Sequence, residues 1–334
     1  MRESAGAPLA PLTTFGLGGP AERLITVDDE AELVDVVRRT DPGLILGGGS
    51  NLVLPDEGLA GTVVQIATQG VSLTPEADDV LVEVQAGESW DALVAHAVDE
   101  GLAGIECLAG IPGLVGGTPI QNVGAYGQEV AQTVVGVRVL DRSGGEVVTL
   151  TDLGFAYRWS RFKAEPGRWV VLAVTYRLRR DRLAQPVRAG DLSRAVGPDR
   201  VPLDQVRDAV LALRRGKGMV LDPSDPDSRS AGSFFTNPIV SVEQAGAIPG
   251  APTHPEADGR VKLSAAWLIE QAGFAKGAFD GPVGLSTKHT LAIVHRGGGT
   301  TADLLRVARA VRSGVHDRFG ILLEAEPVLV GQTL

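Results

Sequence analysis

The stretch GLILGGGSNLVL, residues 43–54, places three successive glycines between two apolar runs. The run at 44–46 is typical of a short buried strand, and the apolar residues after Asn51 indicate that a strand begins again. The glycines Gly47, Gly48 and Gly49 let the main chain approach a ligand closely, and successive N–H groups in such a turn form an anion-binding site. A pyrophosphate would suit this stretch, although an ordinary tight turn explains the same residues equally well.

A second glycine-rich stretch, IPGLVGGTPIQNVGAYG, covers residues 111–127 and contains five glycines and two prolines. It is too broken for regular structure, and an irregular segment of this length inside a domain is usually functional. Neither stretch is the G-x-G-x-x-G fingerprint, because Ser50, Asn51 and an apolar strand, rather than a helix, follow Gly49. Together the two stretches predict a bound dinucleotide of a kind other than the Rossmann type.

Strand and helix patterns alternate around these stretches. Strands are predicted at 22–27, 62–66 and 80–87, with helices at 28–40 and 89–102. A hairpin at 134–150 and a strand at 168–180 follow, and the pattern breaks near residue 200. Beyond that point, helices are predicted at 203–218, 263–274 and 301–320, and strands at 290–296 and 322–331.

Composition narrows the class of protein. Hydrophobic residues make up 44% and charged residues 22% of the 334 residues, as in ordinary soluble globular proteins. The net charge of -10 argues against nucleic acid or an anionic membrane as the main partner. The N-terminal residues lack a signal-peptide pattern and no apolar run is long enough to span a bilayer, so a cytoplasmic protein without membrane insertion is expected.

The titratable residues give no sign of a metal site. Cys107 is the single cysteine, which excludes an intramolecular disulfide and a multi-cysteine zinc site, and we expect a small buried side chain there. The five histidines show no metal-type spacing, and no metal is predicted.

Four further stretches can carry chemistry, and each also has a purely structural explanation. In AYRWSRFK, Arg158 is either a surface cation–π contact or an anion binder. The basic residues of RRGKGMVLDP, residues 214–223, either complement a helix dipole or bind phosphate. In LLEAEPVLVG, residues 322–331, Glu324 and Glu326 have the spacing that puts both on one face of a strand. In AGSFFTNP, Ser233 is either a turn residue or a proton donor in a dry pocket.

In order along the chain, these stretches resemble the flavin-dependent UDP-N-acetylenolpyruvoylglucosamine reductase (MurB) family of peptidoglycan synthesis. The resemblance extends from LTTFGLGGPAE at residues 12–22 through the stretches quoted above to AAWLIEQAGF at 265–274, LSTKHTLAIV at 285–294 and LEAEP at 323–327. The YRWSRFK form is similar to the longer of the two types in this family.

The resemblance implies an α+β fold with a two-part FAD-binding region of the vanillyl-alcohol oxidase type and a C-terminal α/β substrate-binding domain. The implied divisions are 1–66, 67–200 and 201–334. It also implies non-covalent FAD, NADPH as hydride donor, and a monomer. The residues it assigns to the cofactor lie in the two glycine-rich stretches: Gly47, Gly48, Gly49, Ser50, Asn51, Ile111, Pro112, Gly113, Gly116, Gly117, Thr118, Gln121, Asn122, Gly124 and Ala125.

The reaction implied by the resemblance is reduction of the enolpyruvyl ether of UDP-N-acetylglucosamine to UDP-N-acetylmuramate. Flavin N5 delivers the hydride, Arg158 and Glu326 stabilise the enediolate that develops, and Ser233 donates the proton. The residues implied to contact the substrate are Tyr126, Lys217, Asn237 and His289.

The chain departs from the family pattern at two positions. Ala189 stands in VRAGDL where longer-type members have a substrate-binding tyrosine, and Val328 stands where some members have an arginine. The first departure puts the tyrosine clamp over the diphosphate in question, and it implies either weaker substrate binding or a substitute such as Arg188.

Two other functions remain open from sequence. One is a flavin-dependent alcohol or sugar oxidase of the same cofactor-binding group, although the glycine-rich stretches offer no histidine for covalent flavin attachment. The other is an inactive UDP-sugar-binding protein, against which the presence of Arg158, Ser233 and Glu326 together argues.

Overall fold

The computed structural model describes residues 1–188 and 190–334, which divide by their contacts into two compact units. Unit 1 consists of residues 1–7, 21–49 and 59–216, and unit 2 of residues 8–20, 50–58 and 217–334. Each unit is therefore built from segments that are far apart in the sequence. The predicted divisions at residues 66 and 200 follow the sequence continuously and stay a prediction.

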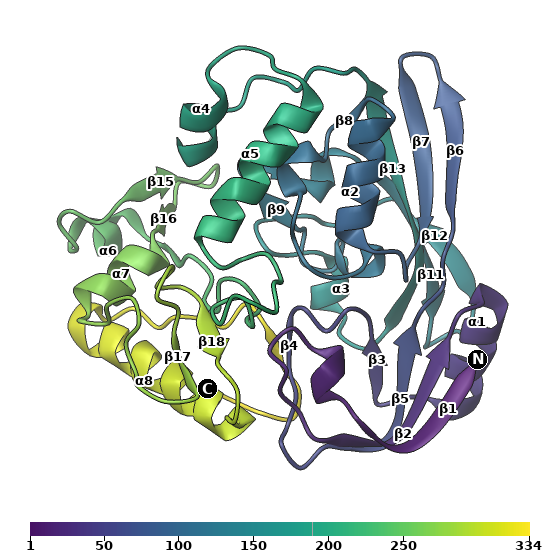
Figure 1. The fold of residues 1–334 in the computed structure, drawn as a ribbon, viewed down its shortest axis with the longest axis horizontal. Helices are drawn as coiled ribbons and strands as arrows, with labels where there is room; N and C mark the ends of the chain where they lie inside the picture. Colours follow the sequence, from purple (N-terminus) through teal and green to yellow (C-terminus); the bar gives the residue numbers. More distant parts are fainter. Residues whose placement is uncertain (189) are drawn as a thin grey trace. The chain divides into compact units, whose positions relative to one another are not determined.

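Unit 1 begins with a four-stranded sheet in the order β1-β2-β5-β3, whose strands lie side by side in Figure 1. Strands β2 and β3 both pair in parallel with β5. The bounds are β1 (Arg2–Pro8), β2 (Pro20–Val27), β3 (Leu44–Leu46) and β5 (Leu59–Ile66). The predicted strand before the three glycines is thus confirmed as β3.

Helix α1 (Glu30–Thr40) connects β2 to β3. It begins at Asp29, whose side chain accepts a hydrogen bond from the Glu32 amide at 2.9 Å and so satisfies one of the free N–H groups of the first turn. Its buried face is formed by Leu33, Val34, Val36 and Val37.

The second sheet of unit 1 is antiparallel, with the order β12-β11-β13-β7-β6 and the short β8 beside β13. Central β13 is buried along most of its length, whereas β7 alternates between buried and half-buried residues. The bounds are β6 (Val71–Glu76), β7 (Asp79–Gln85), β8 (Leu102–Ala103), β11 (Val134–Asp141), β12 (Val147–Leu150) and β13 (Trp169–Arg180). The predicted hairpin at 134–150 is confirmed.

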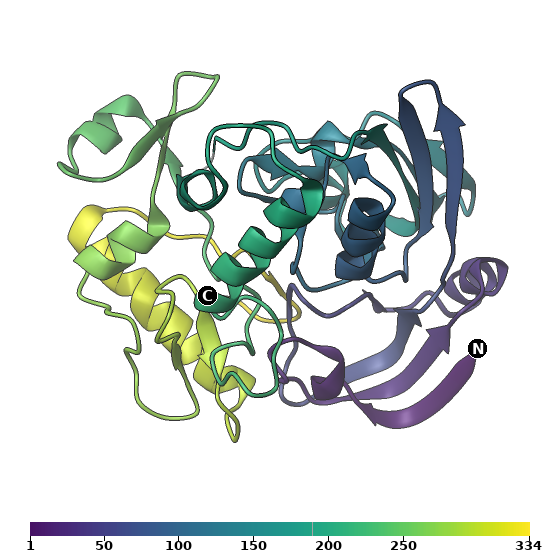
Figure 2. The same ribbon diagram turned by 45° about the horizontal axis from the view of Figure 1, so that its top comes forward.

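Among the other helices of unit 1, α2 follows β7, α3 lies between β12 and β13, and α4 and α5 follow β13. Helix α5 packs against α2, and the two run close together in both Figure 1 and Figure 2. The predicted irregular stretch at 111–127 holds only a 3-10 turn and the short strand β9, which pairs with β10 just after the stretch. The bounds are α2 (Trp90–Asp99), α3 (Arg161–Ala164), α4 (Gly190–Val196), α5 (Leu203–Gly216), β9 (Gly124–Ala125) and β10 (Gln128–Glu129), with 3-10 turns at Glu106–Leu108, Val115–Gly117 and Val130–Gln132.

Unit 2 is organised around the long helix α8, which packs against α7 and the β17–β18 hairpin, as the yellow and light green ribbons of Figure 1 show. A three-stranded sheet has the order β14-β16-β15. The bounds are β4 (Leu52–Val53), β14 (Ile239–Val240), β15 (Thr253–Pro255), β16 (Val261–Leu263), β17 (Val283–Leu285), β18 (Ile293–His295), β19 (Val328–Leu329), α6 (Val242–Gly246), α7 (Ala265–Gln271) and α8 (Thr301–Phe319), with a 3-10 turn at Ala10–Leu12.

The strand predicted over 322–331 is only partly formed. Strand β19 covers two of its residues and pairs in parallel with β4, Val328 opposite Leu52. Before it, Ala325 forms a single bridge with Phe235. Pro327 has no amide hydrogen to donate, which accounts for the interruption between the two pairings.

None of the helices in the described part of the chain combines the length and the apolar character that a membrane span requires.

Candidate functional site

The two glycine-rich stretches are in direct backbone contact within unit 1. A Cβ added to Gly48 would lie 2.8 Å from the Cα of Gly113 and 3.1 Å from the amide nitrogen of Leu114. No side chain fits at that distance, so the close approach requires glycine at position 48. The structure therefore brings together two glycines that are 65 positions apart in the sequence.

Backbone hydrogen bonds hold the second stretch against the end of β7 and the start of α2. The Gly116 amide donates to the Ala86 carbonyl at 2.9 Å, and the Trp90 amide donates to the Gly113 carbonyl at 3.1 Å. The Thr118 hydroxyl is buried and bonds to the Tyr176 hydroxyl at 2.7 Å. The side chain of Thr118 thus serves the fold, as do the Gly116 amide and the Gly113 carbonyl.

Away from the contact between the two stretches, some of their glycines have no neighbouring atoms where a side chain would lie. A Cβ added to Gly47 or Gly117 would meet nothing within 4 Å. Two buried polar atoms of unit 1, Oγ1 of Thr68 and Oε1 of Gln85, have no hydrogen-bond partner among the described residues. Gln85 immediately precedes Ala86, to which the second stretch is bonded. These features fit a bound group that is rich in polar atoms. Sequence reasoning missed Thr68 and Gln85, since only their burial distinguishes them.

The predicted cofactor residues are not all in one unit. Most of them lie in unit 1, whereas Ser50 and Asn51 belong to unit 2. There the Asn51 side-chain amide donates to the carbonyl oxygen of Glu326 at 3.3 Å. Asn51 therefore holds the backbone of a predicted catalytic residue.

The loop that carries Arg158 is docked onto the second stretch. The buried Asn122 side chain donates to the Ala156 carbonyl at 3.0 Å, and the Ser160 hydroxyl donates to the Ile120 carbonyl at 2.5 Å. Arg158 itself has a φ of 53° and donates from Nη2 to the Gly124 carbonyl at 2.8 Å. This backbone conformation is uncommon for a residue other than glycine, and such strain is concentrated at functional sites.

Arg158 also lies over the Tyr157 ring, with 5.3 Å between the guanidinium carbon and the ring centre. The side chain is half-buried rather than fully exposed. The cation–π contact and partial desolvation therefore coexist in one side chain.

A second arginine of unit 1 is buried. Arg214, near the end of α5, is 8% exposed, and burial lowers the pKa of its guanidinium to about 10, an effect that the nearby Tyr126 and Asp91 counter. The group stays charged at neutral pH. The helix-dipole interpretation of RRGKG is thus incomplete, because this side chain brings a positive charge to the interior beside Tyr126.

In unit 2 the backbone segment that follows Ser233 pairs with the segment that contains Glu326. The Glu326 amide donates to the Phe234 carbonyl at 2.8 Å, and the Thr236 amide donates to the Glu324 carbonyl at 3.0 Å. Ser233 is half-buried, and its hydroxyl makes no hydrogen bond to the described residues. Two predicted catalytic residues are therefore held on neighbouring backbone segments.

The two phenylalanines after Ser233 belong to the core of unit 2. Phe234 is 0% and Phe235 2% exposed, and their rings are 5.1 Å apart in an edge-to-face arrangement. Phe234 also lies 6.4 Å from Phe15. Their role is to anchor the segment next to Ser233 by packing.

The predicted substrate residues of unit 2 lie at the ends of short elements. The side-chain oxygen of Asn237 accepts a hydrogen bond at 2.9 Å from the amide of Ala265, the first residue of α7. His289 follows β17, and burial lowers the pKa of its imidazole to about 4, with the positive charges of Lys217 and Lys276 acting in the same direction. Lys217 and His289 are thus close enough to interact electrostatically.

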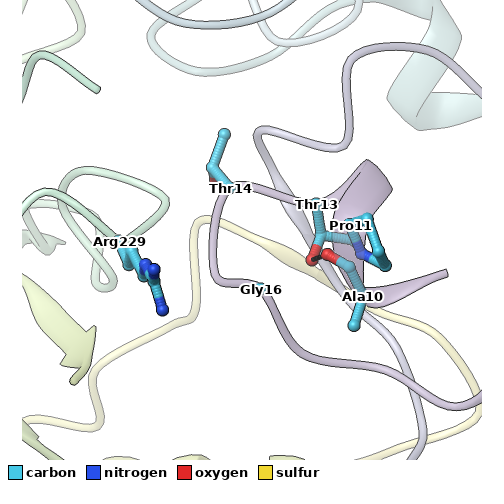
Figure 3. Close-up of a pocket in the computed structure, with 6 residues that line it drawn as sticks. All are labelled: Ala10, Pro11, Thr13, Thr14, Gly16 and Arg229. Carbon is cyan, nitrogen blue, oxygen red and sulfur yellow. Dashed lines mark hydrogen bonds between the residues drawn. The ribbon is translucent and has the colours of Figure 1, made fainter. Parts of the chain in front are cut away.

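An open pocket of about 350 Å³ lies elsewhere in unit 2 (Figure 3). His295 joins its two sides: its ring Nδ1 is 2.8 Å from the Phe15 carbonyl, and its amide donates to the Arg229 carbonyl at 3.0 Å. None of the predicted site residues lines this pocket, which is formed by Ala10, Pro11, Thr13, Thr14, Gly16 and Arg229.

Three further predictions concern single positions. Ala189 lies outside the described residues, and Val328 is exposed and pairs in β19. Cys107 is confirmed as a small buried residue, and burial raises the pKa of its thiol to about 12. In the described part of the chain, no three His, Cys, Asp or Glu side chains are arranged to hold a metal ion.

Comparison with known families adds the decisive observation. The sequence model described as "UDP-N-acetylenolpyruvoylglucosamine reductase, C-terminal domain" matches residues 223–330, and the one described as "FAD binding domain" matches residues 21–151. A UDP-N-acetylenolpyruvoylglucosamine reductase of Thermobifida fusca is 56% identical over 98% of each chain. The chain belongs to the UDP-N-acetylenolpyruvoylglucosamine reductase family.

Other relatives agree with this assignment. The reductase of Streptomyces coelicolor is 53% identical over 100% of this chain and 92% of its own length. Among solved structures, the reductase MurB of Thermus caldophilus is similar, with 28% identity, 98% of both chains covered and a TM-score of 0.67. The predicted α+β fold, with an FAD-binding region of the vanillyl-alcohol oxidase type and a C-terminal reductase domain, is confirmed.

The two matched ranges contain the features described above. Residues 21–151 include both glycine-rich stretches, and residues 223–330 include Ser233, His289 and Glu326. The chain is therefore an FAD-dependent oxidoreductase of the UDP-N-acetylenolpyruvoylglucosamine reductase family, as the sequence predicted.

Proposed function

We propose that this chain reduces the enolpyruvyl ether of UDP-N-acetylglucosamine to UDP-N-acetylmuramate, with NADPH as the reductant, as a cytoplasmic monomer. The observation that carries the proposal is the backbone pairing of the segment after Ser233 with the segment of Glu326. It places a hydroxyl and a carboxyl group, the proton-donor and charge-stabilising functions that such a reduction needs, on neighbouring segments of unit 2.

The glycine-rich stretches are proposed to hold FAD. The backbone contact between Gly48 and Gly113, together with the open faces at Gly47 and Gly117, leaves main-chain N–H groups free of side-chain obstruction. Thr68 and Gln85 supply further polar atoms in the same unit. When bound, FAD supplies the hydride from its N5 atom after taking it from NADPH.

Arg158 is proposed to stabilise negative charge on the substrate. Hydride addition to the terminal carbon of the enolpyruvyl group leaves charge that spreads into the adjacent carboxylate. A guanidinium bonds a carboxylate through two parallel N–H groups, and the bond from Nη2 to the Gly124 carbonyl fixes the orientation of the Arg158 guanidinium. Because the position of the loop is set by Asn122 and Ser160, little reorganisation is needed when the charge develops.

Ser233 is proposed to donate the proton that completes the reduction. A serine hydroxyl is a weak acid, but an enolate carbon is basic enough to take its proton where water is excluded. Glu326, in its protonated form, is proposed to share the charge on the carboxylate. The buried rings of Phe234 and Phe235 hold the backbone beside Ser233 in place.

The remaining assignments concern the UDP-sugar. Lys217 is proposed to supply a positive charge for the diphosphate. The side-chain oxygen of Asn237 accepts from the Ala265 amide, so its side-chain NH₂ group is proposed to donate to the substrate. His289 is neutral at pH 7 because its pKa is about 4, so it acts as a hydrogen-bonding group without adding charge. Tyr126 is proposed to contact the same substrate.

The test separates the two half-reactions by stopped-flow absorbance. We expect Ser233→Ala to leave reduction of bound FAD by NADPH within about twofold of the wild-type rate, and to slow reoxidation by the enolpyruvyl substrate by at least about 10²-fold. Ser224→Ala changes an exposed serine of unit 2 that bonds only locally to Asp222, and serves as the matched control.

Two outcomes would contradict the proposal. Equal losses in both half-reactions would remove Ser233 as the proton donor. Fast reoxidation by dioxygen, with no reoxidation by the enolpyruvyl substrate, would indicate a flavin oxidase instead.

A further inference from the structure

We propose that Asp227 is a positioning residue that sets both the loop of His289 and the turn after Lys217. Asp227 lies in LDPSDPDSRS, residues 221–230, a composition typical of a solvated loop. The structure instead buries it to 2% exposure within unit 2. A carboxylate is seldom buried unless other groups are arranged around it. The inference rests on the proposed function, which assigns Lys217 and His289 to the substrate.

Three donors from the segment after β17 converge on one oxygen of Asp227. Its Oδ2 accepts from the Thr287 amide at 2.8 Å, from the Thr287 hydroxyl at 2.5 Å and from the Ser286 hydroxyl at 3.1 Å. On the other side, Arg296 lies 4.0 Å from Oδ1. Charge-assisted hydrogen bonds of this kind fix geometry more strongly than bonds between neutral groups.

The chain of bonds continues to His289. The Ser286 hydroxyl oxygen accepts from the Lys288 amide at 3.0 Å and from the His289 amide at 3.2 Å. Ser286 is fully buried, so water does not compete for these bonds. Asp227 therefore orders the backbone of His289 through one intermediate side chain.

Asp227 also touches the residue that follows Lys217. Gly218 has a φ of 66°, and a Cβ added there would lie 3.0 Å from the Asp227 carbonyl oxygen and 3.1 Å from its Cβ. A larger residue at 218 would push the two segments apart. The main-chain carbonyl and Cβ of Asp227 thus lie against the turn after Lys217, while its carboxylate bonds to the loop of His289.

A second interaction, an ion pair, links the same two segments but is weaker. Lys288 forms an ion pair with Asp225 at 2.7 Å, and the Lys288 side chain is 38% exposed. Exposed ion pairs of this kind contribute little. The buried contacts of Asp227 are therefore the ones expected to decide where His289 lies.

The test compares Asp227→Ala, Asp227→Asn and Ser286→Ala in the FAD-loaded enzyme. The affinity for the UDP-sugar substrate is measured by calorimetry, and FAD content and circular dichroism report on folding. Loss of the bonds to a buried carboxylate is expected to weaken substrate binding at least about tenfold in Asp227→Ala and less in Asp227→Asn, which keeps one acceptor oxygen. Asp222→Asn, an exposed carboxylate of the same loop that bonds to Ser224, should leave the affinity unchanged.

A double-mutant cycle with His289→Ala separates positioning from general loosening. If Asp227 acts through His289, the double variant loses less affinity than the product of the two single losses. Additive losses, or wild-type affinity in Asp227→Ala, would overturn the inference.

An NMR titration of the His289 ring keeps the test independent of substrate. The pKa of His289 should rise in Asp227→Asn from about 4 toward its ordinary value, since the loop no longer holds the ring in place. If Asp227→Asn fails to fold, the same rise is expected in Ser286→Ala. An unchanged pKa would refute positioning. Wild-type substrate affinity in both His289→Ala and Lys217→Ala, with a shifted pKa in Asp227→Asn, would instead refute only the assignment of those two residues to the substrate.

Discussion

The guanidinium of Arg158 donates from Nη2 to the carbonyl oxygen of Gly124 at 2.8 Å. Gly124 belongs to the second glycine-rich stretch and pairs in the β9–β10 hairpin. The stretch proposed to hold FAD therefore also orients the arginine proposed to stabilise charge on the substrate. Under the proposed function, binding of the cofactor and orientation of Arg158 are linked through the backbone of residues 111–127.

Replacement of Arg158 by lysine tests this orientation. Arg158→Lys keeps the charge but loses the planar fork that can bond to Gly124 and to a carboxylate at once. FAD content is expected to stay constant, while the rate of reoxidation by the enolpyruvyl substrate falls about 10²-fold or more. Arg161→Lys is the control, because Arg161 pairs with Glu165 at 3.4 Å and lies over the Trp169 ring. A wild-type reoxidation rate in Arg158→Lys would contradict the role proposed for the guanidinium.

The contact between Gly48 and Gly113 predicts that neighbouring glycines respond differently to alanine. Gly48→Ala places a methyl group 2.8 Å from a backbone atom and should lower the stability of the FAD-free protein by about 1–3 kcal/mol. In Gly47→Ala the methyl group meets nothing within 4 Å, so the FAD-free protein should be as stable as the wild type.

Measurements with and without FAD distinguish the two glycines. If Gly47 lies against the cofactor, Gly47→Ala weakens FAD binding in fluorescence titration although the protein alone is unaffected. Equal stability of the two FAD-free variants in thermal denaturation would show that the close approach at Gly48 is not maintained in solution.

The burial of Phe234 predicts a structural role. Phe234→Ala removes a fully buried ring that packs against Phe15 and Phe235, and should destabilise the protein by about 3–5 kcal/mol in urea unfolding. Trp159→Ala, at a position that is 48% exposed, should change the free energy of unfolding by less than about 0.5 kcal/mol. A large loss of substrate affinity in Phe234→Ala without loss of stability would place the ring at the site instead.

The lowered pKa of His289 predicts a pH dependence of stability. The imidazole has a pKa of about 4 in the folded chain and about 6.5 when unfolded, so between these values the unfolded state binds the proton more tightly. Stability should therefore fall as the pH drops from about 6.5 to about 4, by up to about 3 kcal/mol, and this residue should contribute nothing to the pH dependence above about 7.5. Urea unfolding of the wild type and His289→Gln at several pH values measures the difference. A parallel pH dependence of both proteins would contradict it.

The sequence was most informative where local chemistry decides the conformation. Helices α1 and α2 begin at Asp29 and Ser89, close to the predicted starts at 28 and 89, because each side chain accepts from a backbone amide of the first turn. The strand before Gly47 and the hairpin at 134–150 also follow from local patterns. The family resemblance added the proposed catalytic residues, which no local pattern distinguishes from turn or surface residues.

The burial of polar residues by segments distant in the sequence could not be predicted in the same way. Asp227 lies in a polar loop, and only its distant contacts with Thr287 and Gly218 show that it is buried. Thr68 and Gln85 likewise have no distinctive neighbours in sequence. The strand predicted around Glu324 and Glu326 was largely wrong, because periodicity ignores the missing amide hydrogen of Pro327.

The discontinuous make-up of unit 2 bears on how the chain is synthesised. Strand β4 is completed by β19, and the Thr301 hydroxyl donates to the Leu54 carbonyl across 247 positions. A nascent chain leaving the ribosome therefore exposes the segments at 8–20 and 50–58 long before their partners are translated. Because pairings between remote positions form slowly, these early segments remain vulnerable to aggregation and to chaperone capture until residues 301–329 have been translated.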